Sequence, residues 1–195
     1  MTRIGILALQ GAFIEHEQML RRLGADVRQV RLPEELAGLD GLIIPGGEST
    51  TIGKLATHYG LVQPLKDFAR AGRPLWGICA GLIFMARDIG NMAQPLLGVM
   101  DITVRRNAFG RQVDSFEAEL DVPVLRNGSD NRAPFHAIFI RGPIIEAVRP
   151  GVEVIARLDD GRIVAARQNH LLVTAFHPEL TDDERFHRYF LELTA

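Results

Sequence analysis

Leu75-Trp76-Gly77-Ile78-Cys79-Ala80-Gly81-Leu82 places the only cysteine of the chain between an apolar run and a segment of helical pattern. Glycines two residues before and two residues after a nucleophile, at a turn from strand to helix, form the nucleophile-elbow pattern. Because glycine has no Cβ, the tight turn can form while the Cys79 side chain points outward. A helix that begins at Ala80 favours the thiolate through its dipole and free N–H groups. The pattern predicts a reactive cysteine; the alternative is a small buried apolar residue.

Strands and helices alternate on both sides of this turn. Periodicity predicts strands over 3–9, 27–30, 41–44 and 74–78, and helices over 13–23, 51–58, 63–71 and 80–88. Such alternation in short units predicts an α/β fold with a parallel sheet and helices on both faces. The second half reads differently, with strands expected over 99–105, 115–120, 137–141, 152–158, 163–168 and 171–176. We expect these to add antiparallel strands to the sheet, with a tight turn at 159–161.

The last segment is predicted to be helical. Thr181 and Glu184 have the spacing of a capping box, and Phe186, Phe190 and Leu193 share one face. With 195 residues the chain is expected to form one domain, residues 1–195. Residues 126–134 are expected to form a surface loop and not a linker between domains.

Composition limits the classes of partner. The formal net charge is −2, which gives no reason to expect nucleic acid or an anionic membrane surface as a partner. No apolar stretch approaches the roughly 20 residues of a membrane span. The sequence runs from Met1 directly into the first predicted strand, which leaves no room for a signal peptide. With a single cysteine, the expected compartment is the reducing cytoplasm.

A catalytic thiol needs a base, and His177 is the strongest candidate among six histidines. His177 follows a predicted strand, so it is expected at the sheet edge where the Cys79 turn also lies. In an extended His177-Pro178-Glu179 segment, the carboxylate lies on the same side as the imidazole and can fix its tautomer. His16, His58 and His187 fall in predicted helices, where we expect solvated surface positions; His136 ends a polar loop and His170 lies in a turn.

Pro45-Gly46-Gly47-Glu48-Ser49-Thr50-Thr51 follows another predicted parallel strand. Acyl transfer needs N–H donors where negative charge develops, and the Gly47 N–H, together with the N–H of Ala80, is expected to form this oxyanion hole. The loop lacks the spacing of a nucleotide-binding P-loop. The alternative is a plain glycine-rich turn in which Ser49 or Thr50 caps the next helix. No cluster of histidines, cysteines and carboxylates has metal-ligand spacing, so no metal is expected.

Together these motifs resemble the class I, triad-type glutamine amidotransferases, and more closely the glutaminase subunits of pyridoxal 5′-phosphate synthase. The resemblance covers essentially the whole chain, and its most specific part is the Arg105–Glu117 stretch. The segments that carry it are Leu9-Gln10-Gly11, Pro45–Thr51, Cys79-Ala80-Gly81-Leu82-Ile83, Arg105–Glu117 and Phe176–Thr181. It implies a three-layer, open, mostly parallel flavodoxin-like sheet, with antiparallel strands added in the second half.

The resemblance also implies roles. Cys79 would be the nucleophile, His177 the acid and base, and Glu179 its orienter. Substrate L-glutamine would be held by Gly47, Glu48, Ser49, Arg106, Ile140 and Arg141. Ammonia would pass to a separate synthase subunit, near which Gln10 would lie. No cofactor is implied, because pyridoxal phosphate would be a product of the pathway.

Three alternatives remain open: a glutaminase that serves another pathway, a cysteine hydrolase or peptidase on a related fold, and a non-catalytic subunit that senses glutamine. The loops over 91–98 and 126–134 depart from the shared motifs and contain no candidate chemistry.

Overall fold

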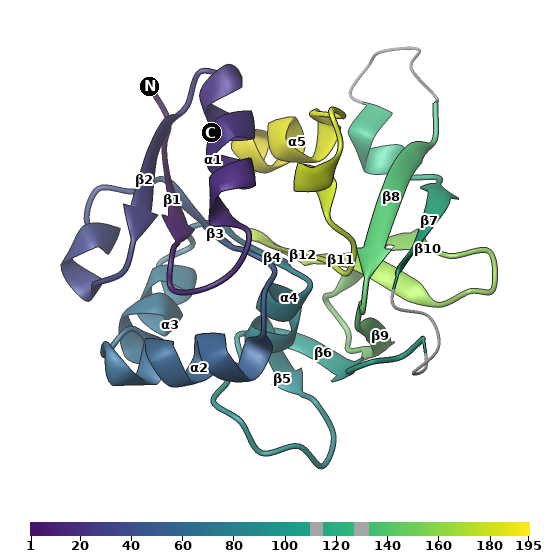
Figure 1. Ribbon diagram of the computed structural model, residues 1–195, viewed down its shortest axis with the longest axis horizontal. Coiled ribbons are helices and arrows are strands. Elements are labelled where there is room, and N and C mark those ends of the chain that lie inside the picture. The colour runs from purple at the N-terminus through teal and green to yellow at the C-terminus, as the bar shows by residue number, and fades with distance from the viewer. Residues whose placement is uncertain (110–114, 127–132) are drawn as a thin grey trace.

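A computed structural model describes residues 1–109, 115–126 and 133–195 of the chain (Figure 1). Residues 110–114 of the Arg105–Glu117 stretch and most of the predicted loop over 126–134 lie outside the described residues. The first half contains β1 (Arg3–Leu7), α1 (Phe13–Arg22), β2 (Asp26–Val30), η1 (Pro33–Leu36), β3 (Gly41–Ile44), α2 (Ser49–His58), α3 (Val62–Arg70), β4 (Leu75–Ile78), α4 (Ala80–Met85) and β5 (Ala86–Asp88). The second half contains β6 (Met100–Arg105), β7 (Ser115–Leu120), η2 (Pro123–Arg126), β8 (Phe135–Ile140), β9 (Ile144–Val148), β10 (Glu153–Arg157), β11 (Ile163–Gln168), β12 (Leu171–Thr174), η3 (Pro178–Leu180) and α5 (Arg185–Leu193).

Within the described residues the main sheet has ten strands, and its parallel part runs in the order β2, β1, β3, β4, β12. Beyond β12 each strand runs antiparallel to the one before it in the order β11, β9, β6, and β10 pairs antiparallel with β11. The first half of the chain therefore supplies β1 to β4 of the parallel part, β12 from the second half completes that part, and the other strands of the second half in this sheet form the antiparallel extension that the sequence predicts.

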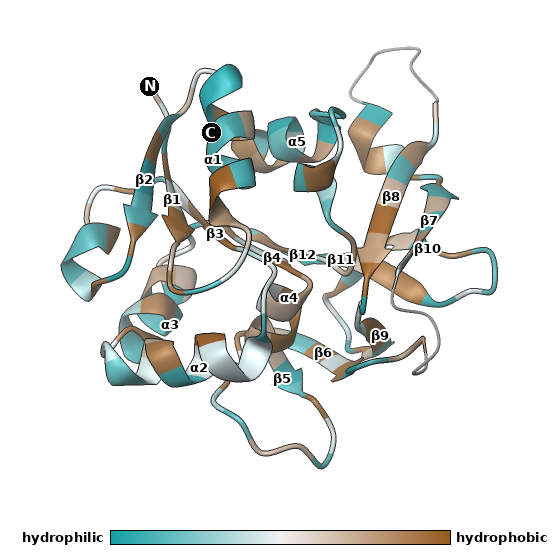
Figure 2. Cartoon of the chain, viewed as in Figure 1, coloured by the Kyte–Doolittle hydropathy of each residue, from teal (hydrophilic) through white to brown (hydrophobic). Residues whose placement is uncertain are grey.

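Helices cover both faces of the sheet. In Figure 1, α1 and α5 lie on one side of the parallel strands, and α2, α3 and α4 lie on the other. The central strands β3, β4 and β12 are buried along their whole length. Figure 2 shows apolar residues along these strands and polar residues on the outward faces of the helices. Burial on both faces is the reason why these strands are continuous apolar runs in the sequence.

Four predicted features differ from the structure. The helix expected over 80–88 ends at Met85 and is followed by β5. All six residues of α4 are buried, so the apolar run in the sequence does not show where the helix ends. Strand β9, which lies between Pro143 and Pro150, is not among the predicted strands. Strands β7 and β8 form a separate two-stranded sheet. The predicted capping box at α5 is wrong, because Thr181 Oγ1 donates a hydrogen bond to the carbonyl of Pro178 in η3 and Glu184 occupies the N-cap.

Candidate active site

The Cys79 turn has the strained backbone of a nucleophile elbow. Cys79 lies between β4 and α4 with φ 50° and ψ −99°, a region that L-residues rarely occupy. A Cβ on Gly77 would lie 2.6 Å from the carbonyl oxygen of Gly81, and a Cβ on Gly81 would lie 2.1 Å from that of Ile44. The two flanking glycines are thus required by close backbone contacts, as the sequence pattern predicts.

His177 and Glu179 are joined as the sequence predicts, although the backbone between them differs from the prediction. Nδ1 of His177 lies 2.7 Å from Oε1 of Glu179, and both residues are buried. The segment is not extended, because Pro178 begins the 3₁₀ turn η3 and the Leu180 N–H donates to the carbonyl of His177. The N–H of His177 donates to the carbonyl of Ile138, which ties the histidine to β8.

The environment of His177 favours its charged form. Burial alone lowers the pKa of His177, but interaction with the Cys79 thiol and the hydrogen bond and charge of Glu179 raise it to about 10. Nε2 of His177 is buried and has no partner within hydrogen-bond geometry among the described residues. Catalytic hydrogen bonds are often long before substrate binds, so this nitrogen is available to the thiol and to substrate.

The glycine-rich loop packs directly against these residues. A Cβ on Gly46 would lie 2.6 Å from Cε1 of His177 and 3.6 Å from Cβ of Cys79, so only glycine fits there. Gly11 has φ +106°, and a Cβ on it would lie 1.8 Å from the carbonyl oxygen of Gly46. Oε1 of Gln10 accepts a hydrogen bond of 2.7 Å from the N–H of Glu48. The turn after β1 therefore fixes the position of the loop.

Glu48, and not Ser49 or Thr50, caps α2. Its carboxylate accepts hydrogen bonds from the N–H groups of Thr50 and Thr51 and from the Thr51 hydroxyl. Burial raises the pKa of Glu48, but these hydrogen bonds outweigh it and lower the pKa to about 2. Nη2 of Arg106 lies 3.5 Å from Oε1 of Glu48. A carboxylate and a guanidinium are therefore adjacent at the start of α2.

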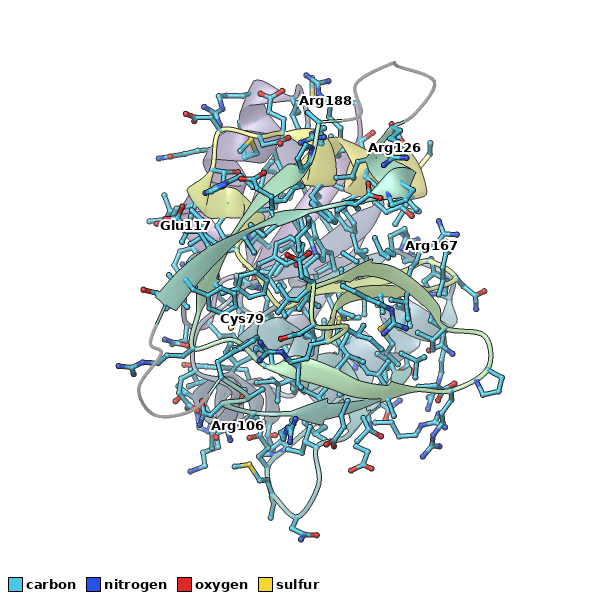
Figure 3. All side chains as sticks on the ribbon, turned by 90° about the vertical axis from the view of Figure 1, so that its right-hand side faces the viewer. Cys79, Arg106, Glu117, Arg126, Arg167 and Arg188 are labelled. Carbon is cyan, nitrogen blue, oxygen red and sulfur yellow. The ribbon has the colours of Figure 1, made fainter. Side chains whose placement is uncertain are left out.

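A cavity of about 360 Å³ brings most of the predicted residues together. Its lining is Gln10, Gly47, Glu48, Ser49, Cys79, Ala80, Ile83, Arg106, Asn107 and Arg141. The carbonyl oxygen of Ile140 lies 3.9 Å from Sγ of Cys79, next to this lining. Figure 3 shows Cys79 at about mid-height in the left half of the view, with Arg106 below it. His177 and Glu179 are buried and do not belong to this lining.

Sequence reasoning missed Gln94 at this site. Its Oε1 accepts hydrogen bonds from Nη1 of Arg106 at 2.8 Å and from the Thr50 hydroxyl at 3.2 Å. Gln94 thereby joins Arg106 to the start of α2. It lies in the 91–98 loop, which has no motif or periodicity, so the sequence holds no signal for this contact. Ile83 and Asn107 line the cavity and were likewise not predicted as site residues.

The predicted solvated positions of His16 and His187 are wrong. Both side chains are fully buried, whereas His58 is exposed as expected. The helical period does indicate burial of both histidines. His16 shares a helix face with Met19 and Leu20, and His187 lies beside Phe186 and Phe190. His136 lies within β8 and not at the end of a loop.

Within residues 1–109, 115–126 and 133–195, no three metal-ligating side chains gather into a possible ion site. Over the same residues, every helix is too short or too polar to cross a bilayer.

Comparison with known proteins identifies relatives over the whole chain. Residues 6–195 match the model of the SNO glutamine amidotransferase family. A protein of Herpetosiphon aurantiacus named pyridoxal 5′-phosphate synthase subunit PdxT is 61% identical over 97% of this chain and 99% of its own. A protein of the same name from Dehalococcoides mccartyi is 58% identical over 98% of this chain and 96% of its own.

Solved structures agree with these relatives. A crystal structure of a glutamine amidotransferase superposes with a TM-score of 0.90 at 51% identity, covering 98% of both chains. The structure of PurLQS from Thermotoga maritima superposes with a TM-score of 0.75 at 16% identity, covering 100% of this chain and 99% of its own, and shares the fold.

Proposed function

The chain belongs to the SNO glutamine amidotransferase family, and from that membership we propose that it hydrolyses L-glutamine to L-glutamate and ammonia for a pyridoxal 5′-phosphate synthase. The observation that carries this proposal is the cavity in which Cys79 lies with Glu48 and Arg106, in front of the His177–Glu179 pair. An endopeptidase would not need this pair of groups, because the residues beside an internal peptide bond carry neither a free α-ammonium nor a free α-carboxylate. We further propose that residues 1–195 form one glutaminase domain that acts in the cytoplasm.

The first half-reaction is attack by Cys79. At neutral pH His177 is protonated, and its charge favours the thiolate of the neighbouring cysteine. The thiolate attacks the side-chain amide carbon of glutamine, and the N–H groups of Gly47 and Ala80 stabilise the oxyanion. The Ala80 N–H suits this role because the first residue of a helix has no intrahelical acceptor for its N–H. His177 then protonates the departing ammonia, which leaves a thioester on Cys79.

The second half-reaction regenerates the cysteine. Once Cys79 is a thioester, the thiolate charge that favours the imidazolium is gone, so the pKa of His177 falls. His177 can then remove a proton from water, which attacks the thioester and releases glutamate. Glu179 holds the imidazole in place throughout and keeps the proton on Nδ1.

Each charged group on the α-carbon of glutamine would be bound by one side chain of opposite charge. We propose that Glu48 accepts the α-ammonium and that Arg106, held by Gln94, binds the α-carboxylate. Gly47, Ser49, Ile140 and Arg141 complete the glutamine site. The partner would be the synthase subunit that consumes the ammonia, with Gln10 close to that contact.

The proposal is tested by measuring ammonia release from L-glutamine by this chain, alone and with a candidate synthase subunit. We expect release by the wild type in the presence of the synthase subunit and none by Cys79→Ala. His58→Ala, on the exposed face of α2, is the control and should retain activity. Release by Cys79→Ala at the wild-type rate would refute the nucleophile. Cleavage of peptides without any action on glutamine would favour the peptidase alternative.

A further inference from the structure

Two buried histidines lie behind the triad and have no role in the reaction described so far. His16 from α1 and His187 from α5 are both 0% exposed, and Nδ1 of His16 lies 2.9 Å from Nε2 of His187. Trp76 makes T-shaped contacts with both rings, with centroid distances of 5.7 Å to His16 and 4.9 Å to His187. Burial of two imidazoles in an aromatic core is costly unless their nitrogens are used.

The pair lies next to the carboxylate of the triad. Nε2 of His16 lies 3.4 Å from Oε2 of Glu179, a close contact that does not meet hydrogen-bond geometry, while Oε1 of Glu179 is bound to His177. Glu179 therefore lies between two histidines, one on each oxygen. Both side chains of the His16–Glu179 contact are 0% exposed, so water does not compete for it.

The protons on these side chains can be assigned by counting donors and acceptors. An ionised Glu179 only accepts hydrogen bonds, so its buried Oε2 needs a donor, and Nε2–H of His16 is the one at hand. With its proton on Nε2, His16 has a bare Nδ1, which must accept from Nε2–H of His187. The arrangement leaves one buried lone pair, on Nδ1 of His187.

The reverse arrangement is less favourable. A protonated Glu179 could donate to His16, which would donate in turn to His187. This would leave an N–H without a partner on Nδ1 of His187, and buried N–H groups without partners are rare. Arg22 is near enough to lower the pKa of His187, and a positive charge favours a bare nitrogen over an N–H. Protonation would also remove the charge that keeps His177 an imidazolium.

We propose that His16 is a positioning residue that donates a hydrogen bond to Oε2 of Glu179, and that His187 fixes the tautomer in which His16 can do so. The inference rests on the proposed glutaminase function and deepens its account of the triad. Burial lowers the pKa of both His16 and His187, so both rings are neutral at neutral pH. A neutral donor holds the carboxylate plane without cancelling the charge that Glu179 presents to His177.

The test compares two substitutions of His16 in the full chain with its synthase subunit. His16→Leu removes the donor and keeps an apolar side chain of similar size, whereas His16→Gln places an amide N–H near the position of Nε2. We expect kcat for ammonia release to fall about 10- to 100-fold in His16→Leu, the effect of one hydrogen bond to a charged group, and to be largely recovered in His16→Gln. KM for glutamine should be unchanged in both, because Glu48 and Arg106 are untouched.

Controls distinguish the loss of Glu179 positioning from a loss of the fold and from a failure of the proposed glutaminase function. Thermal unfolding of both variants reports the fold, and His58→Leu is the matched exposed control. Long-range ¹H–¹⁵N spectra of the wild type should show the proton of both buried rings on Nε2, which needs no variant and no activity. Wild-type kcat in a folded His16→Leu, or a proton on Nδ1 of His16, would overturn the inference. Absence of ammonia release from the wild type with its synthase subunit would instead count against the proposed function.

Discussion

Oε1 of Glu179 accepts a hydrogen bond of 2.7 Å from Nδ1 of His177, and only Pro178 separates the two residues in the chain. Pro178 fixes φ and begins a 3₁₀ turn, which returns the Glu179 side chain toward the imidazole. The pair is therefore set by local backbone geometry, while its alignment with Cys79 depends on the neighbouring strands β4 and β12.

Glu179→Gln should reduce kcat by about 10⁴-fold, the loss seen when the orienting carboxylate of a triad is replaced by its amide. An amide nitrogen facing Nδ1 favours the wrong tautomer, and the charge that supports the imidazolium is lost. Steady-state ammonia release measures the effect, and circular dichroism checks the fold. A kcat within tenfold of the wild type would show that Glu179 does not orient His177.

Gly81→Ala should destabilise the protein by several kcal/mol and abolish glutaminase activity. The added Cβ would lie 2.1 Å from the carbonyl oxygen of Ile44, so β3 and α4 would have to separate at the elbow. The matched control is Gly60→Ala, where φ is +68° but nothing lies within 4 Å of the new Cβ. It should cost only about 1 kcal/mol of backbone strain and leave kcat unchanged. Urea unfolding of both variants measures the difference, and equal costs would contradict the steric argument.

The sequence predicts those parts of the site that depend on local patterns. The Cys79 elbow and the His177–Glu179 pair follow from spacing and glycine placement, and the parallel strands follow from buried apolar runs. Gln94 could not be predicted, because its contact with Arg106 depends on how a loop without periodicity crosses a cavity. The alternative in which Ser49 or Thr50 caps α2 is wrong, because Glu48, which is longer than the usual capping side chains, occupies the N-cap.

Glu48→Gln should raise KM for glutamine by about tenfold or more while the melting temperature changes little. In Glu48 the two N–H groups of the cap are bound by different oxygens, that of Thr50 by Oε1 and that of Thr51 by Oε2. The single amide oxygen of the introduced glutamine can still accept the shorter bond, from the N–H of Thr51, so part of the cap remains, but the negative charge proposed to bind the α-ammonium is lost. Glu48→Ala should in addition lose about 1 kcal/mol of stability, because it removes the cap. Kinetics and thermal unfolding of the two variants separate the roles. An unchanged KM in Glu48→Gln would assign Glu48 to the helix cap alone.

The free energy of unfolding should be greatest near pH 6.5. Titration of His177 should lower it at higher pH, and titration of His187 should lower it at lower pH. The pKa of His177 is raised to about 10, so its contribution is fully present below pH 6.5 and is lost as the pH rises from 6.5 toward 10. Burial, with a smaller effect from Arg22, lowers the pKa of His187 to about 3, so its contribution is present above pH 6.5 and is lost as the pH falls from 6.5 toward 3. Each group changes the free energy of unfolding by about 1.4 kcal/mol per pH unit within its window.

Two variants test which histidine causes the loss of stability on each side of pH 6.5. His187→Leu removes one buried imidazole, so relative to the wild type its free energy of unfolding should fall less steeply between pH 6.5 and 5. Glu179→Gln lowers the pKa of His177, so its alkaline loss should be smaller. Chemical unfolding at each pH gives the slopes. Because carboxylates titrate mainly below pH 5, the comparison from pH 5 to 6.5 isolates the histidines. Parallel pH profiles for the wild type and His187→Leu in that range would show that His187 is not held neutral by burial.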